Sequence, residues 1–124
     1  MAVPNRVLVV DDDVELRETF VDVLAENGFE AIGAADGIDA LLQLRDPEDR
    51  WALVLLDLMM PNMDGRTFRR EQMSDAALAS IPVVILSAAT DVADVARGLD
   101  AVAAMTKPVR LVDLIAIVSK YCPR

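Results

Sequence analysis

The sequence predicts one α/β domain built on a parallel sheet, and three observations carry that prediction. Five short apolar runs alternate with segments of helical period along the 124 residues. The runs are rich in valine, leucine and isoleucine, as expected for strands buried on both faces. One helical segment separates each run from the next, and such crossovers join parallel strands. No repeat, linker or low-complexity tract interrupts the pattern, so we expect residues 1–124 to form a single domain.

The first half of the chain contains two strand–helix units. Val7–Val10 is the first predicted strand, and Asp13 is placed to cap the helix that follows. The apolar residues of that helix recur at helical spacing until Gly28 ends it, at positions Leu16, Phe20, Val23 and Leu24. A weaker strand covers residues 30–34. Asp36 then caps a second helix, whose expected apolar side is Ile38, Leu41 and Leu42.

The second half of the chain continues the alternation with three more units. Residues 52–56 and 83–86 are the third and fourth predicted strands, and a short helix over residues 66–73 lies between them. A helix over residues 92–97 leads to the fifth strand, residues 101–105. The final helix carries apolar residues at i, i+3, i+4 and i+7, namely Leu111, Leu114, Ile115 and Val118.

Composition excludes several classes of function. The net charge of −9 disfavours nucleic-acid binding, and we expect the basic cluster Arg66, Arg69 and Arg70 to be a solvated helix face. The apolar runs are too short to span a bilayer, so no membrane insertion is expected. A single cysteine, Cys122, cannot form an internal disulfide. We therefore expect a soluble cytoplasmic domain.

Charged or hydroxylic residues stand where the predicted strands stop. Asp11 and Asp12 follow the first strand, Asp57 follows the third, Ser87 the fourth and Lys107 the fifth. Because the carboxyl ends of parallel strands share one edge of the sheet, these side chains should converge. The sequence thus predicts a site for a divalent cation and a phosphoryl group.

The acidic members of this site favour a hard cation. Three carboxylates within about 5 Å repel strongly enough that a cation or a proton must neutralise them. Oxygen ligands suit Mg²⁺ or Mn²⁺, and the absence of histidine argues against zinc. The alternative is that Asp11, Asp12 and Asp13 only cap the next helix.

The remaining members favour phosphoryl chemistry, each against a simpler alternative. Asp57 can act as a carboxylate nucleophile that becomes an acyl phosphate, or it is an ordinary turn residue at a strand end. Lys107 can neutralise phosphoryl oxygens, or form a salt bridge to an aspartate, and both roles are compatible. Ser87 can donate a hydrogen bond to a phosphoryl oxygen, although a serine at this position is commonly a turn residue.

With these motifs in order, the chain resembles a response-regulator receiver domain of two-component signalling from about residue 6 to residue 121. The motifs are Val-Val-Asp11-Asp12, Leu-Leu-Asp57-Leu-Met-Met-Pro61 with Asp64-Gly65, Leu-Ser87-Ala88 and Thr-Lys107-Pro108. The resemblance implies a flavodoxin-like, doubly wound five-stranded parallel sheet of order 2-1-3-4-5 with five helices.

The resemblance also implies a role for each acidic residue. Asp57 matches the phosphoacceptor, Asp12 a direct Mg²⁺ ligand and Asp11 a ligand acting through water. The backbone carbonyl of Met59 would complete the protein's share of the coordination. The domain would catalyse only its own phosphorylation and dephosphorylation, and is not otherwise an enzyme.

Two further residues match positions that contact the phosphoryl group in the family. Ser87 matches the switch hydroxyl and Lys107 the phosphate-binding lysine, with a cis bond between Lys107 and Pro108. The phosphodonor would be a phosphohistidine on a sensor histidine kinase or a phosphotransfer protein.

The chain departs from the family pattern at positions that affect signalling and phosphate lifetime. Ala104 stands where the family usually carries tyrosine or phenylalanine, and Val109 replaces another frequent aromatic residue. Because no aromatic rotamer at position 104 can couple to the switch hydroxyl, we expect the face from the fourth strand to the fifth helix to signal differently or weakly. Met59 and Ala89 occupy positions thought to tune phosphate loss, and neither can hold an attacking water. We expect a comparatively long-lived acyl phosphate.

The leading interpretation is a stand-alone receiver that signals by protein contact or passes its phosphate on. A homodimer through the face from the fourth strand to the fifth helix is a further expectation. The first alternative is a receiver domain excised from a larger regulator or hybrid kinase. A remote alternative is a small Mg²⁺-dependent phosphohydrolase, although Asp57-Leu58-Met59 lacks the second aspartate that such enzymes carry.

Overall fold

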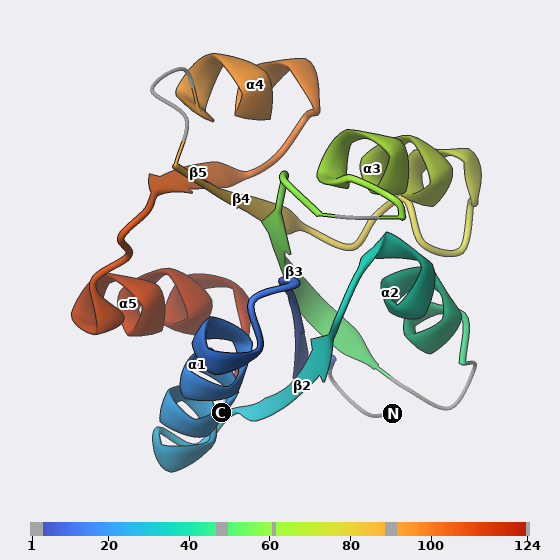
Figure 1. Cartoon of the computed structure of the whole chain (residues 1–124). Coiled ribbons are helices and arrows are strands. Elements are labelled where there is room, and N and C mark those ends of the chain that lie inside the picture. Colours follow the sequence, from blue (N-terminus) through green and yellow to red (C-terminus); the bar gives the residue numbers. More distant parts are fainter. Residues whose placement is uncertain (1–3, 47–49, 61, 89–91, 124) are drawn as a thin grey trace.

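A computed structural model describes residues 4–46, 50–60, 62–88 and 92–123 of the chain. Its centre is a five-stranded sheet of order β2-β1-β3-β4-β5, in which every neighbouring pair is parallel (Figure 1). The strands are β1 (Arg6–Val10), β2 (Glu30–Ala34), β3 (Trp51–Asp57), β4 (Val83–Ser87) and β5 (Ala103–Thr106). The predicted fold class and strand order are confirmed.

In the described parts of the chain, five helices cover the two faces of the sheet. They are α1 (Val14–Glu26), α2 (Gly37–Leu44), α3 (Gly65–Ser74), α4 (Val92–Gly98) and α5 (Leu111–Tyr121). Figure 1 shows α1 and α5 on one face and α2, α3 and α4 on the other. None of the helices within the described ranges has the length and apolar character needed to cross a membrane.

Two apolar cores lie on opposite sides of the sheet because neighbouring residues of each central strand face opposite ways. In β1, Val7 and Val9 pack towards α1 and α5, while Leu8 and Val10 pack towards α2 and α3. All seven residues of β3 are buried. This double burial is the physical reason for the near-continuous apolar runs in the sequence.

Aspartates begin three of the helices. The side chains of Asp13, Asp36 and Asp64 each accept a hydrogen bond from the backbone N–H three residues later, at the start of α1, α2 and α3. Gly28 follows the end of α1 with a φ of 89°, as expected for a helix-terminating glycine. Asp64, which the sequence analysis named only as part of a motif, is thus the N-cap of α3.

The packing face of α2 differs from the prediction. Ile38 and Leu42 are 47% and 67% exposed, whereas Leu41 is buried as expected. The buried residues follow the same helical spacing on a neighbouring stripe, at Gly37, Ala40, Leu41 and Leu44. Gly37 is packed against Met63, where a Cβ would lie 2.8 Å from Met63 Cγ, and Ile38 and Leu42 are left on the outer side of the helix.

The expectation of a solvated basic face on α3 is wrong for Arg69, which is only 4% exposed. Its guanidinium donates to the backbone carbonyls of Leu99 and Asp100, both at 2.9 Å, and to Gln72 Oε1 at 2.8 Å. Arg66 and Arg70 are exposed, as expected. The backbone carbonyls that follow α4 therefore accept hydrogen bonds from Arg69, a residue that we had expected to be exposed to solvent.

Candidate phosphoryl and metal site

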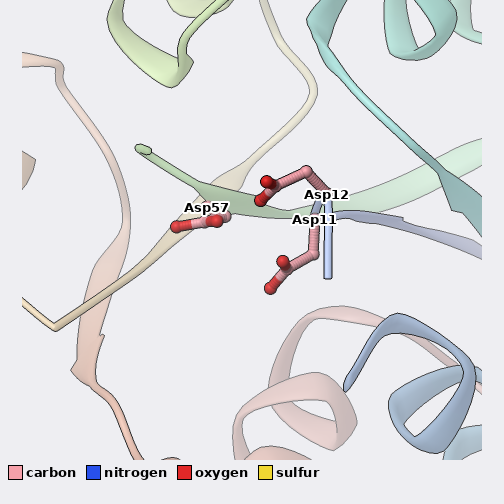
Figure 2. Close-up of side chains that lie close together, drawn as sticks. All are labelled: Asp11, Asp12 and Asp57. Carbon is pink, nitrogen blue, oxygen red and sulfur yellow. The ribbon is translucent and has the colours of Figure 1, made fainter. Parts of the chain in front are cut away.

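The predicted site residues meet at the carboxyl edge of the sheet. Asp11 follows β1 directly, while Asp57 and Ser87 are the last residues of β3 and β4. Carboxylate oxygens of Asp11, Asp12 and Asp57 all lie within 4.8 Å of one another. Figure 2 shows Asp11 and Asp12 leaving the end of β1 in different directions, with Asp57 beside them on β3. The predicted convergence of the three carboxylates is therefore observed.

Asp11 is fixed through both carboxylate oxygens. Its Oδ1 accepts a hydrogen bond from the backbone N–H of Asp13 at 2.9 Å, and its Oδ2 accepts one from Lys107 Nζ at 2.9 Å. The residue is 1% exposed. Asp13 is the N-cap of α1. Helix capping therefore accounts for one of the three consecutive aspartates and leaves Asp11 and Asp12 for the site.

Asp57 is a buried carboxylate with few partners. It is 4% exposed, and its Oδ1 accepts a long hydrogen bond of 3.3 Å from the backbone N–H of Met59. Lys107 Nζ lies 3.5 Å from its Oδ2. Burial, with a further contribution from Asp11, raises the pKa of Asp57 above its ordinary value against the opposing effect of Lys107. The ionised form of this carboxylate is thus under-compensated in the protein alone.

Lys107 bridges the two buried carboxylates. Burial alone would lower the pKa of its ammonium, but the hydrogen bond to Asp11 and the charge of Asp57 raise that pKa above the ordinary value. The backbone N–H of Lys107 donates to the carbonyl of Ser87 at 2.9 Å, and the Lys107–Pro108 bond is cis, as the resemblance implied. The salt-bridge alternative is therefore observed, to two aspartates, and it leaves the ammonium beside Asp57.

After Asp57, the backbone at the start of α3 lies close against the backbone at the end of β3. The backbone N–H of Gly65 donates to the carbonyl of Leu58 at 3.0 Å. A Cβ at Gly65 would lie 2.8 Å from the carbonyl oxygen of Asp57 and from Leu58 Cα. Both are backbone atoms with little freedom to move, so only glycine fits here, and its small size helps to set the backbone that carries Asp57.

The donor set fits a hard divalent cation. Within the described ranges the cluster consists of three carboxylates, with no histidine or cysteine in it. Asp11 and Asp57 are buried while Asp12 is exposed, so the cluster is open to solvent on one side. Oxygen-only sites of this kind suit Mg²⁺ or Mn²⁺ retaining several waters.

For the other residues predicted for the site, the structure gives burial and strand pairing. Ser87 is buried at the end of β4, paired in register with Thr106 of β5. Met59 is 77% exposed in the loop after β3. Ala104 pairs with Ile85 and is partly buried. Ala89 and Pro61 lie outside the described residues. The roles assigned to these positions stay predictions.

One residue near the site was not singled out from the sequence. Arg17 of α1 donates from Nη1 to the backbone carbonyl of Asp11 at 2.7 Å. An arginine in the first turn of a helix has no local signature that distinguishes it from a solvated residue. Only the return of α1 past the end of β1 brings its guanidinium to the acidic loop.

The chain matches known proteins over nearly its whole length. The family model described as the response regulator receiver domain matches residues 7–119. The DNA-binding response regulator MtrA of Mycobacterium tuberculosis is 42% identical over 114 residues, which are 90% of this chain and 48% of MtrA. The phosphate regulon transcriptional regulatory protein PhoB of Escherichia coli is 38% identical over 115 residues, covering 90% of this chain and 49% of PhoB. The chain therefore spans about half the length of the curated relatives it matches.

Solved structures give the same result. A response regulator receiver protein from Pseudomonas putida matches with a TM-score of 0.86 at 31% identity, over 97% of this chain and 99% of that one. The chemotaxis protein CheY4 of Vibrio cholerae matches with a TM-score of 0.84 at 24% identity over 97% of this chain and 99% of its own, a likeness of fold. With its sheet order, its acidic edge and the match over residues 7–119, the chain belongs to the response regulator receiver domain family.

Proposed function

We propose that Asp57 is the residue on which this receiver accepts a phosphoryl group from a phosphohistidine. The observation that carries the proposal is the pairing of Asp57 with Lys107 Nζ at 3.5 Å inside a three-carboxylate cluster. Asp57 is the carboxylate that ends the central strand, and its pKa is raised by burial. A buried acid with a raised pKa and a specific cationic neighbour is typical of a functional group.

The residues that would hold Mg²⁺ are Asp11, Asp12 and Asp57, with the backbone carbonyl of Met59 as a fourth donor. A bound Mg²⁺ supplies neutralising charge for the carboxylates and for phosphoryl oxygens. The raised pKa of Asp57 and the open side of the cluster at Asp12 support this assignment.

The transfer itself requires little from the protein beyond position and charge. A carboxylate oxygen of Asp57 forms the new bond to phosphorus, and the bond from phosphorus to the donor's imidazole nitrogen breaks, leaving its electron pair on the ring. Lys107 stabilises the negative charge that spreads over the phosphoryl oxygens. Its ammonium is already fixed by Asp11 at 2.9 Å, so little reorganisation precedes transfer. Ser87 would donate to one phosphoryl oxygen afterwards.

The deciding experiment is intact mass measurement after incubation with Mg²⁺ and a small acyl-phosphate donor such as acetyl phosphate. We expect one added phosphoryl group on the wild-type chain and none on Asp57→Asn. Asp113→Asn is a matched control, because this exposed aspartate lies in the first turn of α5.

The outcomes separate the parts of the proposal. An adduct on Asp57→Asn as well would place the phosphoryl group on another residue. Absence of both an adduct and Mg²⁺ binding on the wild-type chain would make the carboxylate cluster structural. A chain that accepts phosphoryl only from a purified histidine kinase would retain Asp57 as acceptor and show specificity for the donor.

We further propose a long-lived acyl phosphate. Met59 is 77% exposed beside the acceptor and offers only a thioether to an attacking water. The decay of the adduct after removal of the donor measures the lifetime. A half-life of a few seconds at room temperature, with no phosphatase present, would contradict the proposal.

The output is proposed to be a protein contact, onward transfer of phosphate, or control of an attached effector domain. Two exposed apolar side chains in the first turn of α5, Leu111 and Val112, support a contact surface there. Sedimentation of the chain with and without phosphorylation tests association through this face, with Val112→Asp as the disrupting variant. The length of the native open reading frame separates the stand-alone receiver from a domain of a longer regulator such as MtrA.

A further inference from the structure

Asp11 and Asp12, the two aspartates that directly follow β1, differ in how many hydrogen bonds fix their side chains. Asp11 is fixed through Oδ1 by the Asp13 backbone and through Oδ2 by Lys107. Its backbone N–H also donates to the carbonyl of Ala34 at 3.2 Å. Asp12, in contrast, is exposed, and its carboxylate makes no hydrogen bond or ion pair with any described residue. The direction of the Asp12 side chain therefore depends on the backbone that precedes it.

That backbone is held by Arg17. The guanidinium Nη1 donates to the carbonyl oxygen of Asp11 at 2.7 Å, a short, charge-assisted hydrogen bond. This carbonyl belongs to the peptide unit joining Asp11 to Asp12, and its orientation sets where the Cα of Asp12 lies. The Asp11 N–H contact to Ala34 fixes the preceding peptide unit. The hydrogen bonds from Arg17 and to Ala34 together restrict the backbone rotation of Asp11 and so fix the position of the Asp12 backbone nitrogen and Cα.

The approach of Arg17 depends on a glycine in β2. The Arg17 side chain lies across Gly33, where a Cβ would stand 2.9 Å from Cδ, 3.0 Å from Cγ and 3.3 Å from Nε. A methyl group at Gly33 would therefore displace the arginine stem while leaving its charge in the protein. Gly33 is a strand residue, so the requirement is one of space alone.

We infer that Arg17, seated on Gly33, is a positioning residue that orients the peptide unit between Asp11 and Asp12 and so places Asp12 as a cation ligand. The inference rests on the proposed Mg²⁺ site. In the proposed site, Arg17 and Gly33 would contact neither the cation nor the phosphoryl group. Arg17 acts through the backbone, and contacts behind metal ligands commonly change metal affinity by about tenfold or more when removed.

The inference can be told apart from a simple electrostatic effect because the two predict opposite signs. Arg17 is a cation close to a cation site, so removal of its charge alone would strengthen Mg²⁺ binding. Loss of the orienting hydrogen bond would weaken it. Gly33→Ala keeps the arginine and its charge, and only the orienting role predicts an effect on Mg²⁺ affinity.

The test is isothermal titration calorimetry of the 124-residue chain with Mg²⁺, for wild type, Arg17→Met, Gly33→Ala and Gly98→Ala. We expect about tenfold weaker binding for Arg17→Met and a smaller loss, about threefold or more, for Gly33→Ala. Gly98→Ala is the matched control, because a Cβ there meets no atom within 4 Å, and it should leave the affinity unchanged. Amide NMR should show the Asp12 resonance shifted in the first two variants only.

The outcomes distinguish the inference from the proposed site. Unchanged or tighter Mg²⁺ binding by Arg17→Met and Gly33→Ala, with normal binding by wild type, would overturn the positioning role and leave the metal site intact. No Mg²⁺ binding by wild type would overturn the metal site and the positioning role together. If Arg17→Met fails to fold, Gly33→Ala and the Asp12 amide resonance decide the question.

Discussion

The protein buries charged side chains in two places, which differ in how completely those charges are compensated. At the acidic edge, Asp11 and Asp57 share a single cation, Lys107, and the exposed Asp12 adds a third carboxylate. On α3, Arg69 is buried with Gln72, which donates to the carbonyls of Leu78 and Ile81 at 3.0 and 3.1 Å; we call these two side chains the α3 network.

The difference lies in how completely each region satisfies its own groups. Arg69 has three neutral oxygen acceptors, and no carboxylate of the described chain forms an ion pair with it. Burial lowers the pKa of Arg69, with Asp100 opposing. The α3 network is thus closed by hydrogen bonds, whereas the acidic edge carries more negative charge than Lys107 can compensate. The acidic edge, with its uncompensated negative charge, is therefore the region that can bind a cation. The α3 network, whose hydrogen bonds are satisfied, serves to join α3 to the turns around it.

The largest effect on stability should come from opening the α3 network. Arg69→Ala removes three hydrogen bonds and leaves the carbonyls of Leu99 and Asp100 without their donor. We expect the free energy of unfolding to fall by about 3 kcal/mol, measured by urea denaturation. Arg70→Ala on the exposed side of the same helix is the control and should change it by less than about 0.5 kcal/mol. A loss for Arg69→Ala as small as that of the control would mean that the network contributes nothing.

Removing the shared cation of the acidic edge should have the next largest effect. Lys107→Met leaves Asp11 and Asp57 buried without a counter-charge, and we expect a loss of about 2 kcal/mol at pH 7. Without Lys107 the pKa of Asp57 rises further, so the folded variant takes up a proton before the unfolded chain does. The loss should therefore shrink as the pH falls from neutrality towards the ordinary carboxyl pKa. Lys120→Met, at an exposed cation of α5, should show no such recovery.

A smaller effect, of opposite sign, is expected for the proposed phosphoacceptor. Asp57→Asn removes a buried carboxylate whose ionised form is disfavoured, so the metal-free protein should gain stability on the order of 1 kcal/mol at pH 7 while losing phosphorylation. The gain should diminish as the pH falls and the wild-type Asp57 becomes protonated. Thermal unfolding in a chelator measures it, with Asp22→Asn on the exposed side of α1 as the control. Destabilisation by Asp57→Asn would show that the edge is as balanced as the α3 network.

The smallest expected effect concerns the start of α3, the helix that adjoins both regions. Asp64→Ala removes the exposed side chain that accepts from the Thr67 N–H at 2.8 Å, at a cost of about 0.5 kcal/mol. The hydrogen bond to Thr67 lowers the pKa of Asp64, so its contribution is present at neutral pH and is lost as the pH falls through that lowered pKa. Asp64→Asn keeps a capping oxygen and should retain most of the stability at all pH values.

Much of the fold and the acidic part of the site were predictable because the governing rules are local. Apolar runs marked the five strands, and the first charged residue after the first, third and fifth runs marked the edge where Asp11, Asp57 and Lys107 meet. The second predicted strand coincides with β2, and the ends of the others differ by at most two residues, as in β5, which covers Ala103–Thr106. Parallel topology then forced those ends together.

The sequence by itself therefore determined the parallel sheet and the carboxylate cluster at its edge. Only the tertiary structure decided which groups the arginines serve. Arg69 reaches carbonyls 30 and 31 residues away, and Arg17 reaches the end of the preceding strand. Long, flexible cationic side chains look alike in a sequence whether they end in solvent or in a buried acceptor. Their partners are fixed by how the helices pack, and the periodicity of a single segment carries no record of that packing.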